Sequence, residues 1–166
     1  MKLILETGRL KLREFSFADT QFIIELLNSP GWLRFIGDRN VKSEEQAKHY
    51  IQHRIVKFYL EFGYGFYQVV KKEGEIPIGM CGIVKRDHLD CPEIGFAFLP
   101  EYMGCGYAYE IAKPTLEYAT TTLNIKRIGA ITIPGNDRSI KLLEKIGLKY
   151  KETITKNGEE FLVFSN

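Results

Sequence analysis

The stretch Met103-Gly104-Cys105-Gly106-Tyr107-Ala108 combines residue types that suit phosphate binding. It lies between a predicted strand and a predicted helix. Glycines at such a junction let the backbone turn tightly and approach a ligand closely. Free N–H groups at a helix start attract phosphate, as does the positive end of the helix dipole. A glycine pair before a helix is also a common simple turn, and the ligand that would fit this stretch best is a pyrophosphate.

Two widespread nucleotide sites do not match this stretch. The dinucleotide fingerprint GxGxxG needs a third glycine, and Tyr109 occupies that position. That fingerprint also opens an early βαβ unit, which the pattern of predicted elements lacks. The Walker loop ends in GK followed by Ser or Thr, and the chain contains no such run. We therefore expect a different phosphate-bearing ligand.

The hydrophobic pattern predicts the elements that position this stretch. Predicted strands cover 6–15, 64–71, 76–85, 93–99 and 127–133, and two more flank the hairpin turn Asn157-Gly158. Predicted helices follow the capping residues Ser16 and Ser43 and cover 107–123 and 139–146, while 32–40 is a predicted loop. The order predicts an α+β (mixed α/β) fold, a largely antiparallel sheet with one parallel strand–helix–strand crossover. Pro114, inside a predicted helix, predicts a kink near Glu110.

Composition narrows the class of protein. The chain has 166 residues, of which 45% are hydrophobic, and we expect a single domain spanning 1–166. The net charge of +2 and the absence of a basic run argue against nucleic acid as a partner. No apolar run approaches a membrane span, so we expect a soluble cytoplasmic protein without a membrane partner. Cys81, Cys91 and Cys105 are too widely spaced for a zinc site, so we expect free thiols and no metal.

Four segments together resemble a known family. They are TGRLKLREF from Thr7 to Phe15, EIGFAFLPEYMGCGYAYE from Glu93 to Glu110, NDRS from Asn136 to Ser139, and LLEKIGL from Leu142 to Leu148. The chain resembles the Gcn5-related N-acetyltransferase superfamily, and within it the branch that acetylates the N-termini of ribosomal proteins. The order of elements matches over nearly the whole chain, and the specific motifs cover roughly its second half. The resemblance implies transfer of an acetyl group from acetyl-CoA to a primary amine, directly and within a ternary complex.

The resemblance also implies a donor site. In the family the loop pattern [QR]xxGx[GA] holds the CoA pyrophosphate through backbone N–H groups, which here corresponds to Met103 through Ala108. Gly106 and Ala108 occupy the small positions, whereas Met103 replaces the usual Gln or Arg. The pantetheine arm would pair with the backbone of Phe96, Ala97 and Phe98. Asn136 matches an asparagine that reaches the same arm, although an asparagine in a turn is common.

Glu93 and Ser139 are the candidate catalytic residues. Acyl transfer requires that the amine lose a proton and that the departing thiolate gain one. By resemblance, Glu93 would act as general base through water and Ser139 would stand near the leaving sulfur. The alternatives are a surface carboxylate at a strand end and a serine that stabilises a helix start. Many superfamily members carry a catalytic tyrosine where this chain has Leu143.

The acceptor is less defined by the sequence. The resemblance implies an amine, carried by a small molecule or by a peptide N-terminus. Candidate lining residues are Trp32, Arg34, Phe35 and Asp38. His88 lies either near this site or in a plain loop. The runner-up function is a non-catalytic acyl-CoA sensor or interaction module of the same fold. A homodimer is compatible with the family, and a sheet edge at 161–164 would be the place for strand pairing.

Overall fold

One eight-stranded sheet forms the centre of the computed structural model, which describes residues 1–166. The strand order is β1-β2-β3-β4-β5-β6-β8-β7, and every neighbouring pair is antiparallel except β5 and β6. The strands are β1 (Leu3–Glu6), β2 (Leu10–Arg13), β3 (Phe66–Lys71), β4 (Ile76–Val84), β5 (Glu93–Phe98), β6 (Gly129–Thr132), β7 (Lys149–Lys156) and β8 (Glu159–Ser165). The predicted mixed α+β fold with one parallel crossover is confirmed.

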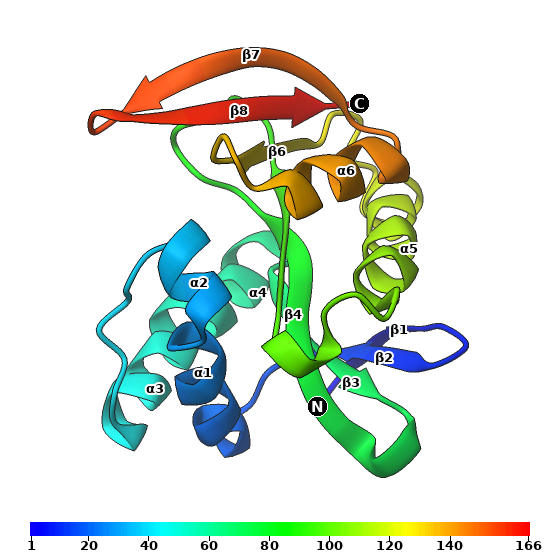
Figure 1. Ribbon diagram of the computed structural model, residues 1–166. Coiled ribbons are helices and arrows are strands. Elements are labelled where there is room, and N and C mark those ends of the chain that lie inside the picture. The colour runs from blue at the N-terminus through cyan, green and yellow to red at the C-terminus, as the bar shows by residue number, and fades with distance from the viewer.

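Helices cover both faces of this sheet. They are α1 (Thr20–Leu27), α2 (Pro30–Phe35), α3 (Glu44–Tyr50), α4 (Lys57–Phe62), α5 (Tyr107–Thr121) and α6 (Asp137–Ile146). Figure 1 shows α1 to α4 gathered on one side of the long strand β4, and α5 and α6 on the other side. Each group packs on its own apolar cluster, with Leu26 and Ile51 in the first and Ile111 and Leu143 in the second.

The N-terminal strand prediction is wrong in one respect. The segment predicted as a single strand over 6–15 turns back at Thr7–Arg9, so that β1 and β2 form a hairpin. The N–H of Thr7 donates to the carbonyl of Leu10 at 2.9 Å and closes the turn. The capping box at Ser16 and Asp19 is confirmed, and it opens the short 3-10 turn η1 (Phe17–Asp19) ahead of α1.

The predicted loop over 32–40 is also partly wrong, because α2 occupies its first part. Pro30 is the first residue of α2, where its fixed φ angle favours a helix start. Trp32 is 5% exposed, and its indole N–H donates to the carbonyl of Gly37 at 3.1 Å. Trp32 therefore belongs to the core, and its role in lining an acceptor site stays a prediction.

A long helical run follows, from Glu44 to Phe62. The predicted capping box is confirmed, since Ser43 accepts from the N–H of Gln46 and the side chain of Gln46 accepts from Ser43. Between α3 and α4 the run widens into a π-helical segment, η2 (Ile51–Val56). π-Helical segments are rare in proteins, and many of those that occur lie at functional sites.

The C-terminal hairpin turns at Asn157-Gly158 as predicted, with positive φ angles of 53° and 80°. Strand β8 lies between β6 and β7, so residues 161–164 do not form a sheet edge and that expectation is wrong. The outer strands are β1 and β7, and the homodimer stays a prediction. Helix α5 runs without interruption through Pro114, and the kink near Glu110 stays a prediction. None of the helices has the length and apolarity that crossing a membrane requires.

Candidate active site

Strands β5 and β6 touch at one end and then separate. Glu93 pairs with Gly129, and no other residue of β5 pairs with β6. On its other side, β5 pairs with β4 along its whole length. The parallel pair therefore opens toward the carboxyl end of β5, directly before the glycine-containing loop.

The open edge of β5 exposes unpaired backbone groups. The N–H of Leu99 donates to Ile78 on the β4 side at 2.9 Å, whereas the carbonyl of Pro92 accepts from Gly129 on the β6 side at 2.8 Å. Because backbone direction alternates along a strand, Phe96 and Phe98 direct their N–H and C=O groups toward the opening. Ala97 instead pairs with Met80. Of the three predicted backbone contacts, two are available and Ala97 is occupied.

The glycine-containing loop presents a row of free donors beside this edge. None of the amide N–H groups from Gly104 to Tyr109 donates a hydrogen bond within the protein. Gly104 and Gly106 have φ angles of 75° and 82°, a region that favours glycine over other residues. Gly106 is also the N-cap of α5. The N–H donors of this helix start are free, and no carboxylate of the protein binds them. The helix start is therefore suited to bind an anion.

The β1–β2 turn holds this helix start in place. The Glu110 carboxylate accepts from the hydroxyl of Thr7 at 2.6 Å, and from the backbone N–H and the guanidinium of Arg9 at 2.8 and 2.7 Å. Arg9 also donates to the carbonyl of Cys105 at 3.2 Å. Burial alone would raise the pKa of Glu110, but these hydrogen bonds outweigh it and lower that pKa below its ordinary value.

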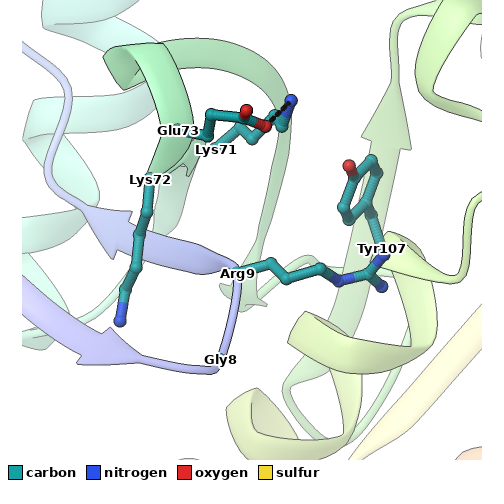
Figure 2. Close-up of a pocket in the computed structure, with 6 residues that line it drawn as sticks. All are labelled: Gly8, Arg9, Lys71, Lys72, Glu73 and Tyr107. Carbon is teal, nitrogen blue, oxygen red and sulfur yellow. Dashed lines mark ion pairs between the residues drawn. The ribbon is translucent and has the colours of Figure 1, made fainter.

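Figure 2 shows how Arg9 reaches from this turn to the start of α5. Its guanidinium lies 4.3 Å from the centre of the Tyr107 ring. A cavity of about 270 Å³ borders the pair, and Lys71, Lys72 and Glu73 complete its wall. Lys71 pairs with Glu73 at 2.7 Å, and the ammonium of Lys72 donates to the carbonyl of Thr7 at 2.6 Å. The bracing role of Arg9 and Glu110 was not predicted, because nothing in the sequence links residues a hundred positions apart.

The start of α6 faces the same loop. The Arg138 guanidinium lies 3.6 Å from the sulfur of Met103. Asn136 is the N-cap of α6, and its side-chain oxygen accepts from the N–H of Ser139 at 3.4 Å. The Ser139 hydroxyl forms no hydrogen bond within the protein and is half-buried, so it does not cap the helix itself. Leu143 is buried in the core. A larger tyrosine side chain would not fit at this position unless its neighbours moved.

Glu93 sits where β5 and β6 meet, and it is buried. It is 3% exposed, which rules out the alternative of a surface carboxylate. Its side chain lies on the same face of β5 as that of Ala97, because side chains alternate, and Ala97 packs on the cluster of helices α1 to α4. One carboxylate oxygen lies 3.0 Å from Nε of Arg86 and the other 3.2 Å from Nε2 of His88.

His88 connects Glu93 to the C-terminal hairpin. Its second ring nitrogen lies 3.4 Å from the ammonium of Lys156 in β7. His88 is therefore not in an unconnected loop, and Arg86 is a partner of Glu93 that sequence reasoning missed. The run Arg86-Asp87-His88 just before the strand was the available signal. A buried carboxylate with a histidine beside it can accept a proton, directly or through water.

The remaining candidates lie at the surface of the helical layer. The Arg34 guanidinium stacks on the Phe35 ring at 4.8 Å, and Asp38 accepts from the N–H of Asn40 at 2.8 Å. Cys81 and Cys91 are buried free thiols, while Cys105 is an exposed one. Burial raises the pKa of Cys81 to about 12. No three His, Cys, Asp or Glu side chains are grouped so that they would hold a metal ion.

Comparison with known proteins agrees with this geometry. Residues 9–149 match the family model described as the acetyltransferase (GNAT) domain. The chain is 31% identical to the uncharacterized N-acetyltransferase YnaD of Bacillus subtilis (strain 168), over 93% of this chain and 90% of that protein. An acetyltransferase structure from Agrobacterium tumefaciens str. C58 superposes with a TM-score of 0.83 at 24% identity, over 100% of this chain and 94% of that one.

A further solved structure shares the fold at lower identity. It is RimL, a ribosomal L7/L12 alpha-N-protein acetyltransferase in complex with coenzyme A, with a TM-score of 0.84 at 14% identity over 99% of this chain and 97% of that one. The eight-stranded sheet that opens between its two parallel strands, next to a helix start with free donors, is that of an acetyltransferase. The chain belongs to the GNAT acetyltransferase family.

Proposed function

We propose that this protein transfers an acetyl group from acetyl-CoA to a primary amine, directly and within a ternary complex. The observation that carries the proposal is the row of free N–H groups from Gly104 to Tyr109 beside the unpaired edge of β5. In this proposal the helix start binds the CoA pyrophosphate. The pantetheine arm pairs with Phe96 and Phe98, as an added strand would.

The acyl group would then reach the end of the opening where Glu93 lies. An amine that is protonated in water must lose a proton before it attacks the thioester. Glu93 would accept this proton through a water molecule, with His88 as its hydrogen-bond partner and Arg86 holding the carboxylate in place. A backbone N–H of β5 that faces the opening would bind the oxyanion that forms on the thioester carbonyl.

Ser139 is the proposed group beside the departing sulfur. Its hydroxyl makes no hydrogen bond within the protein, so it is free to donate one to a thiolate. The side-chain amide N–H₂ of Asn136 is free as well, because only its oxygen is engaged in the cap, and it would contact the pantetheine arm. Both residues lie at the start of α6, whose Arg138 touches Met103 of the loop.

A second candidate is a non-catalytic acyl-CoA sensor of the same fold. Two observations favour it. Both oxygens of Glu93 already have a partner within the protein, one Arg86 and the other His88. The position at which many superfamily members carry a tyrosine is the buried Leu143.

Release of free CoA thiol from acetyl-CoA separates the two candidates. The assay adds primary amines one at a time, and the amine-free reaction measures background hydrolysis. The enzyme predicts CoA release above that background with at least one amine, together with the mass of an acetylated product. The sensor predicts acetyl-CoA binding with no amine-dependent release, and a chain that binds no CoA would contradict both.

A further inference from the structure

A second cavity, of about 290 Å³, opens on the helical layer and is lined by arginines. Its wall comes from the segment after α2 and from the helical run α3–η2, and includes Arg39, Asn40, Gln46, His49, Tyr50 and Arg54. No Asp or Glu lines it. Arg54 lies on the π-helical segment η2, directly beyond Tyr50 at the end of α3.

The positive charge of this cavity is uncompensated. Arg39 and Arg54 form no ion pair, although Arg9, Arg13, Arg86 and Arg127 each have a carboxylate partner within 4 Å. Of the carboxylates next to the cavity in sequence, Asp38 pairs with Lys42 and Glu44 pairs with Lys48, whereas Glu45 has no ion pair and does not line the cavity.

The cavity beside Tyr107 shows the opposite arrangement. There Arg9 pairs with Glu110 at 2.6 Å, Lys71 pairs with Glu73 at 2.7 Å, and Lys72 lies 3.6 Å from Glu6. Each cation that lines that cavity therefore has a partner from the protein. Of these two cavities, the arginine-lined one is the one whose cations have no carboxylate partner.

Arg86 holds Glu93, and Tyr50 belongs to the cavity wall. The Nε of Arg86 lies 3.0 Å from the Glu93 carboxylate. Burial raises the pKa of Tyr50, and the charges of Arg39, Arg86 and Arg54 oppose that rise. The Tyr50 phenol thus lies within the field of these guanidinium groups. Glu93 and the cavity lie on the same face of the sheet, the face covered by α1 to α4.

We propose that the acceptor carries an anionic group, a carboxylate or a phosphate, that Arg39 and Arg54 bind while its amine lies at Glu93. The inference rests on the proposed acetyltransferase function. Guanidinium groups bind carboxylate and phosphate in a fork geometry that is stronger than a neutral hydrogen bond. A polycationic amine would meet like charge at this cavity, so polyamines are poor acceptors. An amine and an anionic group occur together in a small amino acid and in a peptide whose N-terminus precedes acidic residues.

Matched acceptor pairs test the charge requirement. One set consists of ω-amino acids and ω-aminoalkyl phosphates of increasing length, the acids compared with the corresponding ω-amino carboxamides and the phosphates with the corresponding ω-amino alcohols. A second set consists of the C-terminally amidated peptides Ala-Asp-Glu-Ala and Ala-Asn-Gln-Ala, and spermidine represents the polycations. We expect at least one anionic acceptor to exceed its neutral counterpart in kcat/KM by about tenfold or more, the effect of one charge-assisted hydrogen bond. The set in which this happens identifies the source of the anion.

The double variant Arg39→Ala/Arg54→Ala tests the location. It is expected to raise KM for the anionic acceptor by about tenfold or more, with little change in kcat, in KM for the neutral counterpart, or in affinity for acetyl-CoA. Lys57→Ala is the matched control, because it removes an exposed cation of the same layer that does not line the cavity. For Lys57→Ala, the ratio of kcat/KM between the anionic acceptor and its neutral counterpart should stay within about twofold of the wild-type ratio.

Calorimetric binding of the same pairs to the CoA-loaded protein gives a readout that does not depend on turnover. Equal binding of acids and amides, a preference for spermidine, or a double variant that behaves like Lys57→Ala would overturn the inference. Loss of acetyl-CoA affinity in the double variant would also overturn it, because the cavity would then belong to the donor. Failure of the wild type to bind CoA would count against the proposed function, whereas a preference for the anionic ligands would still support the cavity's role.

Discussion

The two sides of the opening between β5 and β6 are built from different parts of the chain. The proposed donor side consists of backbone groups, namely the N–H row from Gly104 to Tyr109 and the free edge at Phe96 and Phe98. The proposed acceptor side consists of charged side chains, with Glu93 at the end of the opening and Arg39 and Arg54 farther out. A ligand common to a whole family can be held by backbone, whereas a particular acceptor needs side chains that differ between members. The donor side should therefore respond to changes of backbone conformation, and the acceptor side to changes of charge.

The largest effect is expected for Glu93→Gln. The amide keeps the shape but cannot accept the amine proton, so kcat should fall by roughly 10² to 10⁴. Steady-state kinetics over a range of pH would measure this, and equilibrium binding should show an unchanged affinity for acetyl-CoA. Asp90→Asn is the control. Asp90 lies three residues before Glu93, but it is exposed and forms an ion pair with Arg127. A kcat within threefold of the wild type would exclude Glu93 as the base.

The donor side should respond most strongly to Gly106→Val. At φ 82° a β-branched residue is strained by about 1–3 kcal/mol, so the loop should relax to another conformation. If CoA must restore the original conformation, its affinity should fall by roughly 5- to 150-fold. Calorimetry with CoA measures the change. Gly158→Val places the same strain at φ 80° in the distant β7–β8 turn, where it should lower stability without affecting CoA binding. Equal CoA affinity in the two variants would contradict the placement of the pyrophosphate.

The brace between α5 and the β1–β2 turn should have a smaller effect. Glu110→Gln removes the charge that Thr7 and Arg9 engage, and should lower the free energy of unfolding by about 1 kcal/mol, because the ion pair is partly exposed. The folded protein lowers the pKa of Glu110 below its ordinary value of 4.5. Its contribution is therefore fully present above that value and is lost as the pH falls through the folded pKa.

Denaturant unfolding between pH 7 and pH 3 measures this contribution. The wild type should lose more stability on acidification than Glu110→Gln, and the two curves should converge at the acid end. Glu117→Gln is the matched control on the same helix, since Glu117 is exposed and lies 3.8 Å from Lys113. Parallel curves for the wild type and Glu110→Gln would show that the brace contributes nothing.

The smallest effect is expected for Met103→Gln. It restores the residue type usual in the family loop, yet the N–H of Met103 is already engaged with the carbonyl of Pro100. If backbone donors dominate the donor side, CoA affinity should stay within about threefold of the wild type. A gain of tenfold or more in the same calorimetric assay would mean that side chains matter on this side as well.

The difference between local backbone features and long-range side-chain contacts explains what the sequence could predict. The strand, glycine loop and helix from Glu93 to Thr121 were predicted closely, because positive-φ glycines and a helical apolar period leave local signals. Helix α2 was missed because Pro30-Gly31 was taken only as the end of α1, although Pro at the first helical position also starts a helix. The turn between β1 and β2 lies within a segment whose alternating pattern fits one strand as well as two.

Contacts between distant segments left no local signal. Glu110 meets Arg9, and Arg39 and Arg54 come to line the same cavity, only after the chain has folded. Glu93 itself was predicted from family resemblance, while its burial and its partners depend on the meeting of β5 and β6. The sequence thus predicted the local structure around the glycine-containing loop well and the long-range contacts poorly.

Ligand-dependent thermal stability would show whether the glycine-containing loop binds acetyl-CoA. The wild type and Gly106→Val are heated with acetyl-CoA, CoA, ATP or NAD, each at the same concentration. A ligand at 100 times its dissociation constant stabilises by about 2.7 kcal/mol, which for a chain of this size raises Tm by roughly 5–10 °C. We predict this rise for the wild type with both CoA ligands, and a much smaller rise for Gly106→Val. A rise with ATP or NAD and none with either CoA ligand would contradict the account.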